Sequence, residues 1–120
     1  ECFLSENTRL PMMYMEDAVN ATIQLMQAKP EDIKIRNSYN LAAMDFTPKE
    51  VAKAIKQYIP NFKITHKSDF RQEIADKWPK SINDDQARED WNWKPKYDIK
   101  SMTVLMLEKL EEKYNTSTLK

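Results

Sequence analysis

The chain is 120 residues long, which is enough for one domain. Its 19 lysines and arginines balance 19 aspartates and glutamates, so the composition excludes a general nucleic-acid-binding protein, which needs a net basic surface. A hydrophobic content of 41% excludes wholesale disorder, and the uncharged apolar runs are too short to cross a bilayer.

The first thirty residues predict an extended segment followed by a helix. Residues 1–5 and 9–15 have the pattern of extended chain, and Pro11 opposes a helix there. Two acidic residues, Glu16 and Asp17, then favour the start of a helix that ends at Pro30. Its apolar stripe consists of residues at helical spacing, namely Val19, Ile23 and Met26, flanked by Ala18, Thr22 and Leu25.

The middle of the chain predicts a strand, a helix and another strand. Apolar residues of one parity alternate with polar residues over 33–41, which is typical of a strand. Residues 47–50 read Thr-Pro-Lys-Glu, a capping box with proline at the first helical position, and predict a helix that ends at Pro60. Alternation returns over residues 62–66 and predicts another strand.

The last third predicts mostly helix. Residues 68–78 are expected to be a loop with one helical turn, and Asp84 to cap a short helix that reaches Trp91. Ser101 is expected to cap the final helix, and residues 114–120 to be a frayed tail. The residues expected to face inward on that helix are Met102, Leu105, Met106 and Leu110. This order of strands and helices indicates an α/β or α+β arrangement.

The absence of glycine restricts the chemistry of the chain. Without glycine, neither a GxGxxG turn, nor a Walker-type loop, nor a G-x-S-x-G nucleophile elbow is present. The single cysteine and single histidine exclude an internal disulfide and a zinc site made from these two residue types alone. If the protein uses a dinucleotide, residues outside this chain must bind it.

Three stretches resemble the C-terminal part of the extended short-chain dehydrogenases/reductases, a group that includes the sugar-nucleotide epimerases. Residues 9–18 resemble the arginine, strand, acidic residue and helix start of that group, and residues 39–50 its strand and threonine-capped helix. Residues 84–95 resemble its short helix followed by aromatic residues and proline. Within the group, residues 8–14 and 74–79 are most similar to the short-chain-type L-threonine 3-dehydrogenases.

The resemblance covers residues 1–113 and implies the substrate-binding portion of an NAD-dependent enzyme, without its glycine-rich Rossmann half. The catalytic Tyr-x-x-x-Lys pair of the family is also absent, and Asn92 and Ala43 stand where the family commonly has glycine. The resemblance therefore implies that the missing half binds NAD and that this chain alone is inert. The whole protein, a homodimer, is expected to oxidise L-threonine to 2-amino-3-ketobutyrate.

Three residues are candidate substrate-binding residues. The resemblance implies that Trp78 approaches bound threonine, whereas an ordinary core or hinge tryptophan is the structural alternative. In sugar-nucleotide relatives, arginines at the positions of Arg9 and Arg71 clamp a diphosphate. In a threonine dehydrogenase each arginine instead holds a carboxylate. The carboxylates considered are those of Glu16, Asp17, Asp69 and Asp76. No catalytic, cofactor-binding or metal-binding residue is predicted.

Two other functions fit the same residues. One is a fragment of a sugar-nucleotide epimerase or dehydratase, in which Arg9 and Arg71 bind the diphosphate. The other is a non-enzymatic binding module that retains the fold of the substrate-binding portion, which forms a lid over the substrate in the family. The expected partners are L-threonine and the missing Rossmann half, with neither nucleic acid nor membrane. A cytoplasmic location is expected because the chain opens without a signal pattern, or a mitochondrial one if the source is eukaryotic.

Overall fold

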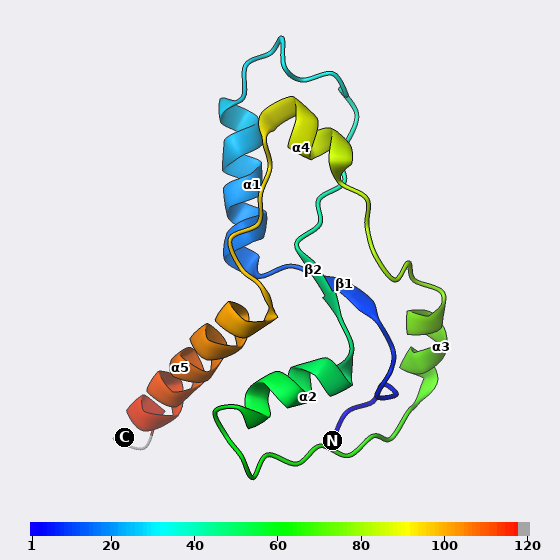
Figure 1. Ribbon diagram of the computed structural model, residues 1–120, viewed down its shortest axis with the longest axis vertical. Coiled ribbons are helices and arrows are strands. Elements are labelled where there is room, and N and C mark those ends of the chain that lie inside the picture. Colours follow the sequence, from blue (N-terminus) through cyan, green and yellow to red (C-terminus); the bar gives the residue numbers. More distant parts are fainter. Residues whose placement is uncertain (118–120) are drawn as a thin grey trace.

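The structure is a computed structural model that describes residues 1–117 (Figure 1). Over these residues the chain forms five helices and one pair of short strands, which confirms the α/β, α+β-like class. The elements in chain order are β1 (Leu10–Met12), α1 (Met15–Gln27), β2 (Met44–Phe46), α2 (Pro48–Lys56), α3 (Phe70–Asp76), α4 (Asp85–Trp91) and α5 (Ile99–Ser117).

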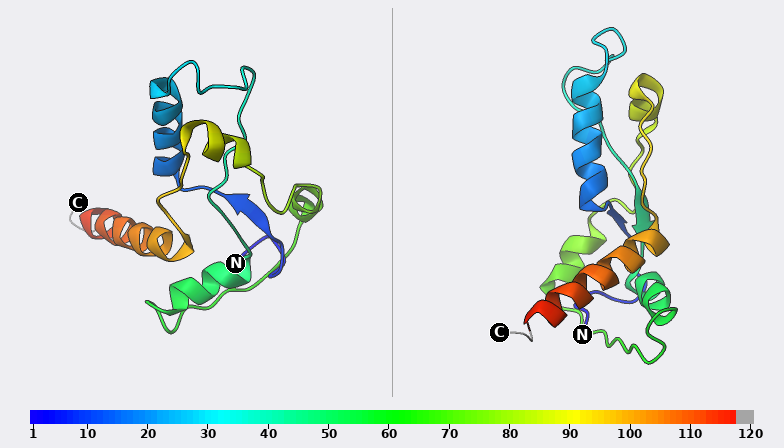
Figure 2. Two further views of the ribbon diagram at one scale, coloured as in Figure 1. Left: turned by 45° about the horizontal axis from the view of Figure 1, so that its top comes forward. Right: turned by 90° about the vertical axis from the view of Figure 1, so that its left-hand side faces the viewer.

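The chain is more open than a complete domain of its length. Its radius of gyration is 17.5 Å, whereas a compact domain of 120 residues has about 14 Å. The antiparallel β1–β2 ladder pairs Leu10 with Phe46 and Met12 with Met44. Helices α1 and α4 lie side by side at one end of this ladder, and α2 and α3 lie at the other end (Figures 1 and 2).

Capping residues explain where the helices begin and end. The predicted capping box of α2 is confirmed: Thr47 Oγ1 accepts a hydrogen bond from the N–H of Glu50, and Glu50 Oε2 accepts one from the N–H of Thr47. Asn92 ends α4 with a left-handed φ of 57°, a conformation that glycine adopts most readily. Asparagine tolerates this conformation because its short polar side chain bonds locally.

Two predicted helix starts and one predicted loop need correction. Asp84 lies at the N-cap position of α4, but its carboxylate bonds the N–H of Ala42 and the side chain of Arg88 and caps no α4 amide. Before α5, Asp98 and Ser101 exchange backbone-to-side-chain bonds, so Asp98 replaces the predicted cap Ser101. The single turn predicted within residues 68–78 is the seven-residue helix α3, capped by Asp69.

Helix α5 also differs from its prediction. It continues to Ser117, into the predicted tail of residues 114–120, of which 118–120 lie outside the described residues. Thr103 is its buried residue. Of the residues predicted to face inward, Met102 and Leu105 are half-buried, whereas Met106 and Leu110 are exposed.

Two of the predicted strands lack a partner strand. Over residues 33–41 no strand forms, although the burial still alternates: the odd-numbered apolar residues are half-buried and Lys34, Arg36 and Asn40 are exposed. Residues 1–5 and 62–66 meet only at one parallel bridge, Cys2 with His66. A strand is stable only when a neighbouring strand pairs its backbone, and within the described residues nothing provides that edge.

The core is small and lies between α1, α4 and the segment after α4. Its fully buried residues are Ala21, Ala87 and Trp93. Helix α1 therefore packs through its small residues, and three residues of its predicted apolar stripe face outward. Val19, Ile23 and Met26 are 52%, 45% and 81% exposed. The outer face of α1, defined by these three residues, is apolar and uncovered in this chain.

Two buried carboxylates connect distant segments. Asp17, 1% exposed, accepts hydrogen bonds from the N–H groups of Lys96 and Tyr97 at 2.9 and 3.1 Å. Asp90 accepts hydrogen bonds from the hydroxyl of Tyr39 at 2.6 Å and from Lys34 and Gln86. These bonds lower the pKa of Asp90 to about 2, and the bond from Tyr39 has the largest effect.

Candidate functional site

The predicted site residues gather around α3 and the turn that precedes β1. Gln72, on α3, connects these two segments. Its Oε1 accepts a hydrogen bond from the N–H of Ser5 at 2.8 Å, and its amide contacts the buried Thr8. The same side chain donates from Nε2 to Asp76 Oδ1 at 2.7 Å. Sequence patterns did not identify Gln72, because its partners Ser5 and Thr8 lie 67 and 64 residues away.

A hollow of about 190 Å³ lies beside this cluster. It brings together Arg9 and Trp78, two of the three predicted substrate-binding residues, and it does not include Arg71. Its lining residues are Ser5, Asn7, Thr8, Arg9, Ala75, Asp76, Trp78 and Lys80. A larger apolar hollow of about 650 Å³, between the end of α1 and residues 30–39, contains none of the predicted site residues.

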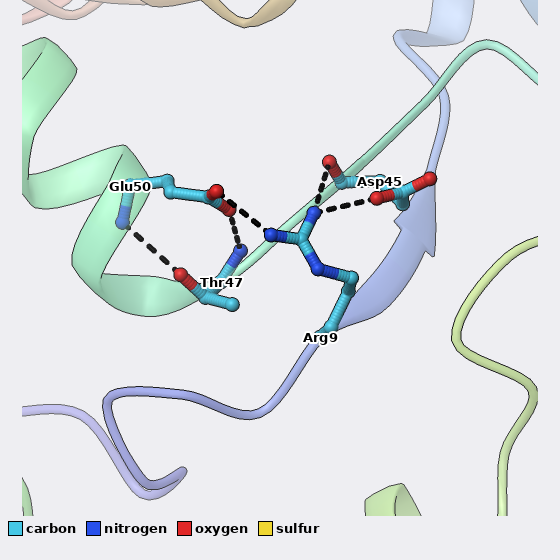
Figure 3. A network of polar contacts seen from close by, with 4 residues as sticks. All are labelled: Arg9, Asp45, Thr47 and Glu50. Carbon is cyan, nitrogen blue, oxygen red and sulfur yellow. Dashed lines mark hydrogen bonds and ion pairs between the residues drawn. The ribbon is translucent and has the colours of Figure 1, made fainter.

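Arg9 is occupied by two carboxylates (Figure 3). Its guanidinium forms ion pairs with Asp45, at the centre of β2, and with Glu50, in the first turn of α2, the latter at 2.7 Å. The hydrogen bonds to these carboxylates raise the pKa of Arg9, and the bond to Glu50 has the largest effect. The prediction that Arg9 holds a carboxylate is confirmed, but neither partner is among the four considered from the sequence.

Arg71 is also occupied. Its guanidinium binds both carboxylate oxygens of Asp69 at 2.6–3.1 Å and lies over the ring of Phe3 at 3.4 Å from the centroid. The hydrogen bonds raise the pKa of Arg71 and lower that of Asp69. Asp69 is one of the predicted partners, so for Arg71 the structural ion pair is confirmed in detail.

Trp78 follows α3 and is open to solvent. Its indole is 58% exposed, and its backbone N–H bonds the carbonyl of Ala75 at 3.1 Å. It continues an exposed apolar row on α3 formed by Phe70 and Ile74, which are 72% and 49% exposed. Trp78 is therefore not a core residue of this chain, and its contact with threonine, like the hinge alternative, stays a prediction.

The described part of the chain has neither a metal-binding cluster nor a membrane-spanning helix. Among residues 1–117, no group of three or more His, Cys, Asp or Glu side chains is arranged to hold a metal ion. None of the described helices is both long enough and apolar enough to cross a membrane. The lining of the hollow of about 190 Å³ includes an indole and side chains of both charges.

Comparison with known proteins identifies the architecture. No family model matches the chain. A curated relative, an uncharacterized epimerase/dehydratase of Staphylococcus aureus, is 47% identical over 112 residues, which are 92% of this chain and 35% of that protein. A GalE-like L-threonine dehydrogenase from Cupriavidus necator superposes with a TM-score of 0.88 and is 50% identical, over 91% of this chain and 39% of that one. The chain has the fold of the C-terminal part of an extended short-chain dehydrogenase/reductase.

A further solved structure agrees with this assignment. L-threonine dehydrogenase from Clostridium difficile superposes with a TM-score of 0.91 at 44% identity, over 94% of this chain and 36% of that one. The resemblance to the short-chain-type L-threonine 3-dehydrogenases, predicted from the sequence, is therefore confirmed. This chain spans little more than a third of the length of the relatives that it matches.

Proposed function

We propose that this chain is the substrate-binding portion of an enzyme that oxidises L-threonine to 2-amino-3-ketobutyrate with NAD. The similarity to two threonine dehydrogenases supports the enzyme class. The observation that supports threonine as the substrate is that both arginines already form ion pairs within the chain. Arg9 is neutralised by Asp45 and Glu50, and Arg71 by Asp69. A diphosphate clamp needs arginines that are free to bind phosphate, so the sugar-nucleotide alternative is disfavoured.

The chemistry of the reaction divides the work between this chain and the rest of the enzyme. Oxidation of the threonine hydroxyl needs a base for its proton, and NAD, when bound, accepts the hydride. The residues of this chain do not fit NAD, because a chain without glycine lacks the turn that approaches a pyrophosphate. In this proposal Trp78 and the neighbouring hollow form a wall over threonine, and the Rossmann half supplies base and cofactor.

The uncovered apolar surfaces support a missing half. Among the described residues, the outer face of α1 and the larger hollow are uncovered, and the strand-like residues 33–41 have no partner strand. Apolar surface of this kind is characteristic of an interface. We place the Rossmann half against these surfaces, with an edge of its sheet along residues 33–41.

The isolated chain is expected to self-associate because the outer face of α1 is uncovered. Sedimentation velocity from low to high protein concentration measures this association. Ile23→Asp puts a charge at the centre of the face and is expected to keep the chain monomeric over the same range. Ile59→Asp is the matched control, since Ile23 and Ile59 are 45% and 44% exposed and Ile59 follows α2. Equal association of both variants would contradict the assignment of this face.

A chimera tests the proposed function. Residues 1–113 of this chain replace the matching part of the Cupriavidus necator enzyme, and NADH formation is followed with L-threonine. The chimera is expected to reduce NAD in a threonine-dependent reaction. Residues 1–120 alone are expected to leave NAD unreduced, whether or not threonine is present. The unaltered Cupriavidus necator enzyme is the control.

Three results would count against the proposal. A chimera that binds NAD but leaves threonine unchanged refutes the substrate. A chimera that binds a uridine diphosphate sugar more tightly than threonine supports the epimerase/dehydratase alternative. A binding module without an enzymatic role is favoured if the chimera binds NAD and neither compound.

A further inference from the structure

We infer that the hollow beside Trp78 recognises the zwitterion of a small α-amino acid, with Asp76 binding its ammonium group and Lys80 its carboxylate. The inference rests on the proposed function and adds the charge-recognising residues to it. Both side chains line the same hollow of about 190 Å³. Neither was a candidate from the sequence, where Asp76 was considered only as a partner for an arginine.

The carboxylate of Asp76 is held so that one oxygen remains available. Its Oδ1 accepts a hydrogen bond from Gln72 Nε2 at 2.7 Å, and no described residue bonds its Oδ2. Gln72 is itself fixed by the N–H of Ser5 and by Thr8. A carboxylate fixed through one oxygen presents the other in a defined direction, which favours a charge-assisted bond to an ammonium group.

The lining of the hollow also includes the cation Lys80. Arg9 also lines the hollow, but its guanidinium already binds Asp45 and Glu50. The Lys80 ammonium group forms neither an ion pair nor a hydrogen bond with any residue that the structure describes. It is therefore the positive charge that remains for the carboxylate of a ligand.

Size and polarity restrict the ligand further. Pockets for drug-sized ligands occupy about 300–1,000 Å³, so a hollow of about 190 Å³ fits a smaller molecule. The indole of Trp78 offers an apolar face for a short side chain. Opposite charges on the lining and one apolar wall together match an amino acid such as threonine. They do not match a nucleoside diphosphate, whose charged groups are all negative.

Three ligands and four variants of the chimera test this assignment. The ligands are L-threonine, 3-hydroxybutyrate, which lacks the amino group, and L-threoninamide, which lacks the carboxylate. Their affinities are measured by calorimetry in the presence of NADH, which cannot accept a hydride, so the ligands bind without turnover. The unsubstituted chimera is expected to bind L-threonine at least about tenfold more tightly than either analogue, because each analogue leaves one charged side chain unpaired.

The two site variants are expected to give opposite patterns. Asp76→Asn should abolish the preference for L-threonine over 3-hydroxybutyrate and retain the preference over L-threoninamide. Lys80→Met should do the reverse. Glu73→Gln and Lys77→Met are the controls, since both residues are exposed, close in sequence and absent from the lining. Both controls should retain both preferences.

The outcomes separate the inference from the proposed function. If Asp76→Asn and Lys80→Met weaken all three ligands equally, or leave both preferences intact, the zwitterion assignment is wrong. The proposed function survives that result as long as the chimera still oxidises threonine. If the chimera does not oxidise threonine but the two site variants still show their opposite preferences, the proposed reaction is wrong. The assignment of the amino-acid site is then retained.

Discussion

Replacing Trp93 with alanine is expected to lower the free energy of unfolding by about 3–5 kcal/mol, the usual cost of truncating a buried tryptophan. Trp93 is 1% exposed and packs with Ala21 and Ala87 in the only fully buried cluster among the described residues. Its Nε1 also donates to the carbonyl of Ala42 at 3.1 Å. Alanine would leave both a cavity and an unpaired carbonyl between α1 and α4.

The loss is large relative to the stability available. Domains are stable by about 5–15 kcal/mol, and this chain buries few large side chains. Urea titration of residues 1–120 at a concentration where the chain is monomeric measures the change. Trp78→Ala is the control and is expected to cost less than about 1 kcal/mol, as exposed residues usually do. Similar losses for Trp93→Ala and Trp78→Ala would show that the core is not where the structure places it.

In the chimera, Trp78→Ala is expected to reduce kcat/KM for L-threonine by about 10–200-fold, as loss of apolar contact with a small substrate does. The indole lines the hollow and is 58% exposed in the isolated chain, so it is free to close over a ligand. Affinity for NAD without threonine is expected to change little, because NAD binds to the other half of the enzyme in the proposed function.

Trp91→Ala distinguishes a site residue from a packing residue. Trp91 is half-buried and meets the ring of Tyr39 edge-on at 6.0 Å, so alanine there should lower the melting temperature more than it alters threonine kinetics per folded enzyme. If Trp78→Ala destabilises the fold while the folded fraction oxidises threonine normally, Trp78 is a packing residue. The assignment to the family would stand in that case, whereas the assignment of the site would not.

Local signals predicted the helices well and the strands poorly. The capping box of α2 depends on residues within four positions of one another, so it can be identified in isolation. A strand depends on a distant edge. Residues 33–41 carry the alternation and even the burial pattern of a strand, yet none forms within the described chain because no partner edge is present. Sequence alternation therefore indicates that a residue is suited to a sheet, and a partner decides whether the sheet forms.

The same distinction applies to the apolar stripe of α1. Val19, Ile23 and Met26 have helical spacing, and the spacing correctly predicts a helix. It does not reveal which neighbour the apolar face packs against, and in this chain Ala21 and Asp17 face inward instead. An apolar stripe thus identifies a surface that needs covering, whether by the same chain or by another part of the enzyme.

At the site, the predictability of a contact depended on its distance along the chain. The Arg71–Asp69 pair joins residues two positions apart and was among the predicted possibilities. The partners of Arg9, Asp45 and Glu50, lie 36 and 41 residues away, and the pairing of β1 with β2 brings them close. Gln72 has neither a motif nor a nearby partner, so only the folded chain reveals it.

The bonds of Asp17 also constrain the order in which the chain folds. Among the described residues, its carboxylate accepts hydrogen bonds from the amides of Lys96 and Tyr97, which lie 79 and 80 residues further along the chain. On the ribosome, α1 emerges long before these residues and must wait with a charged group that has no native partner. Closing so long a loop is entropically costly. Helix α1 is thus made before the segment that follows α4, yet it is seated only after that segment has been made.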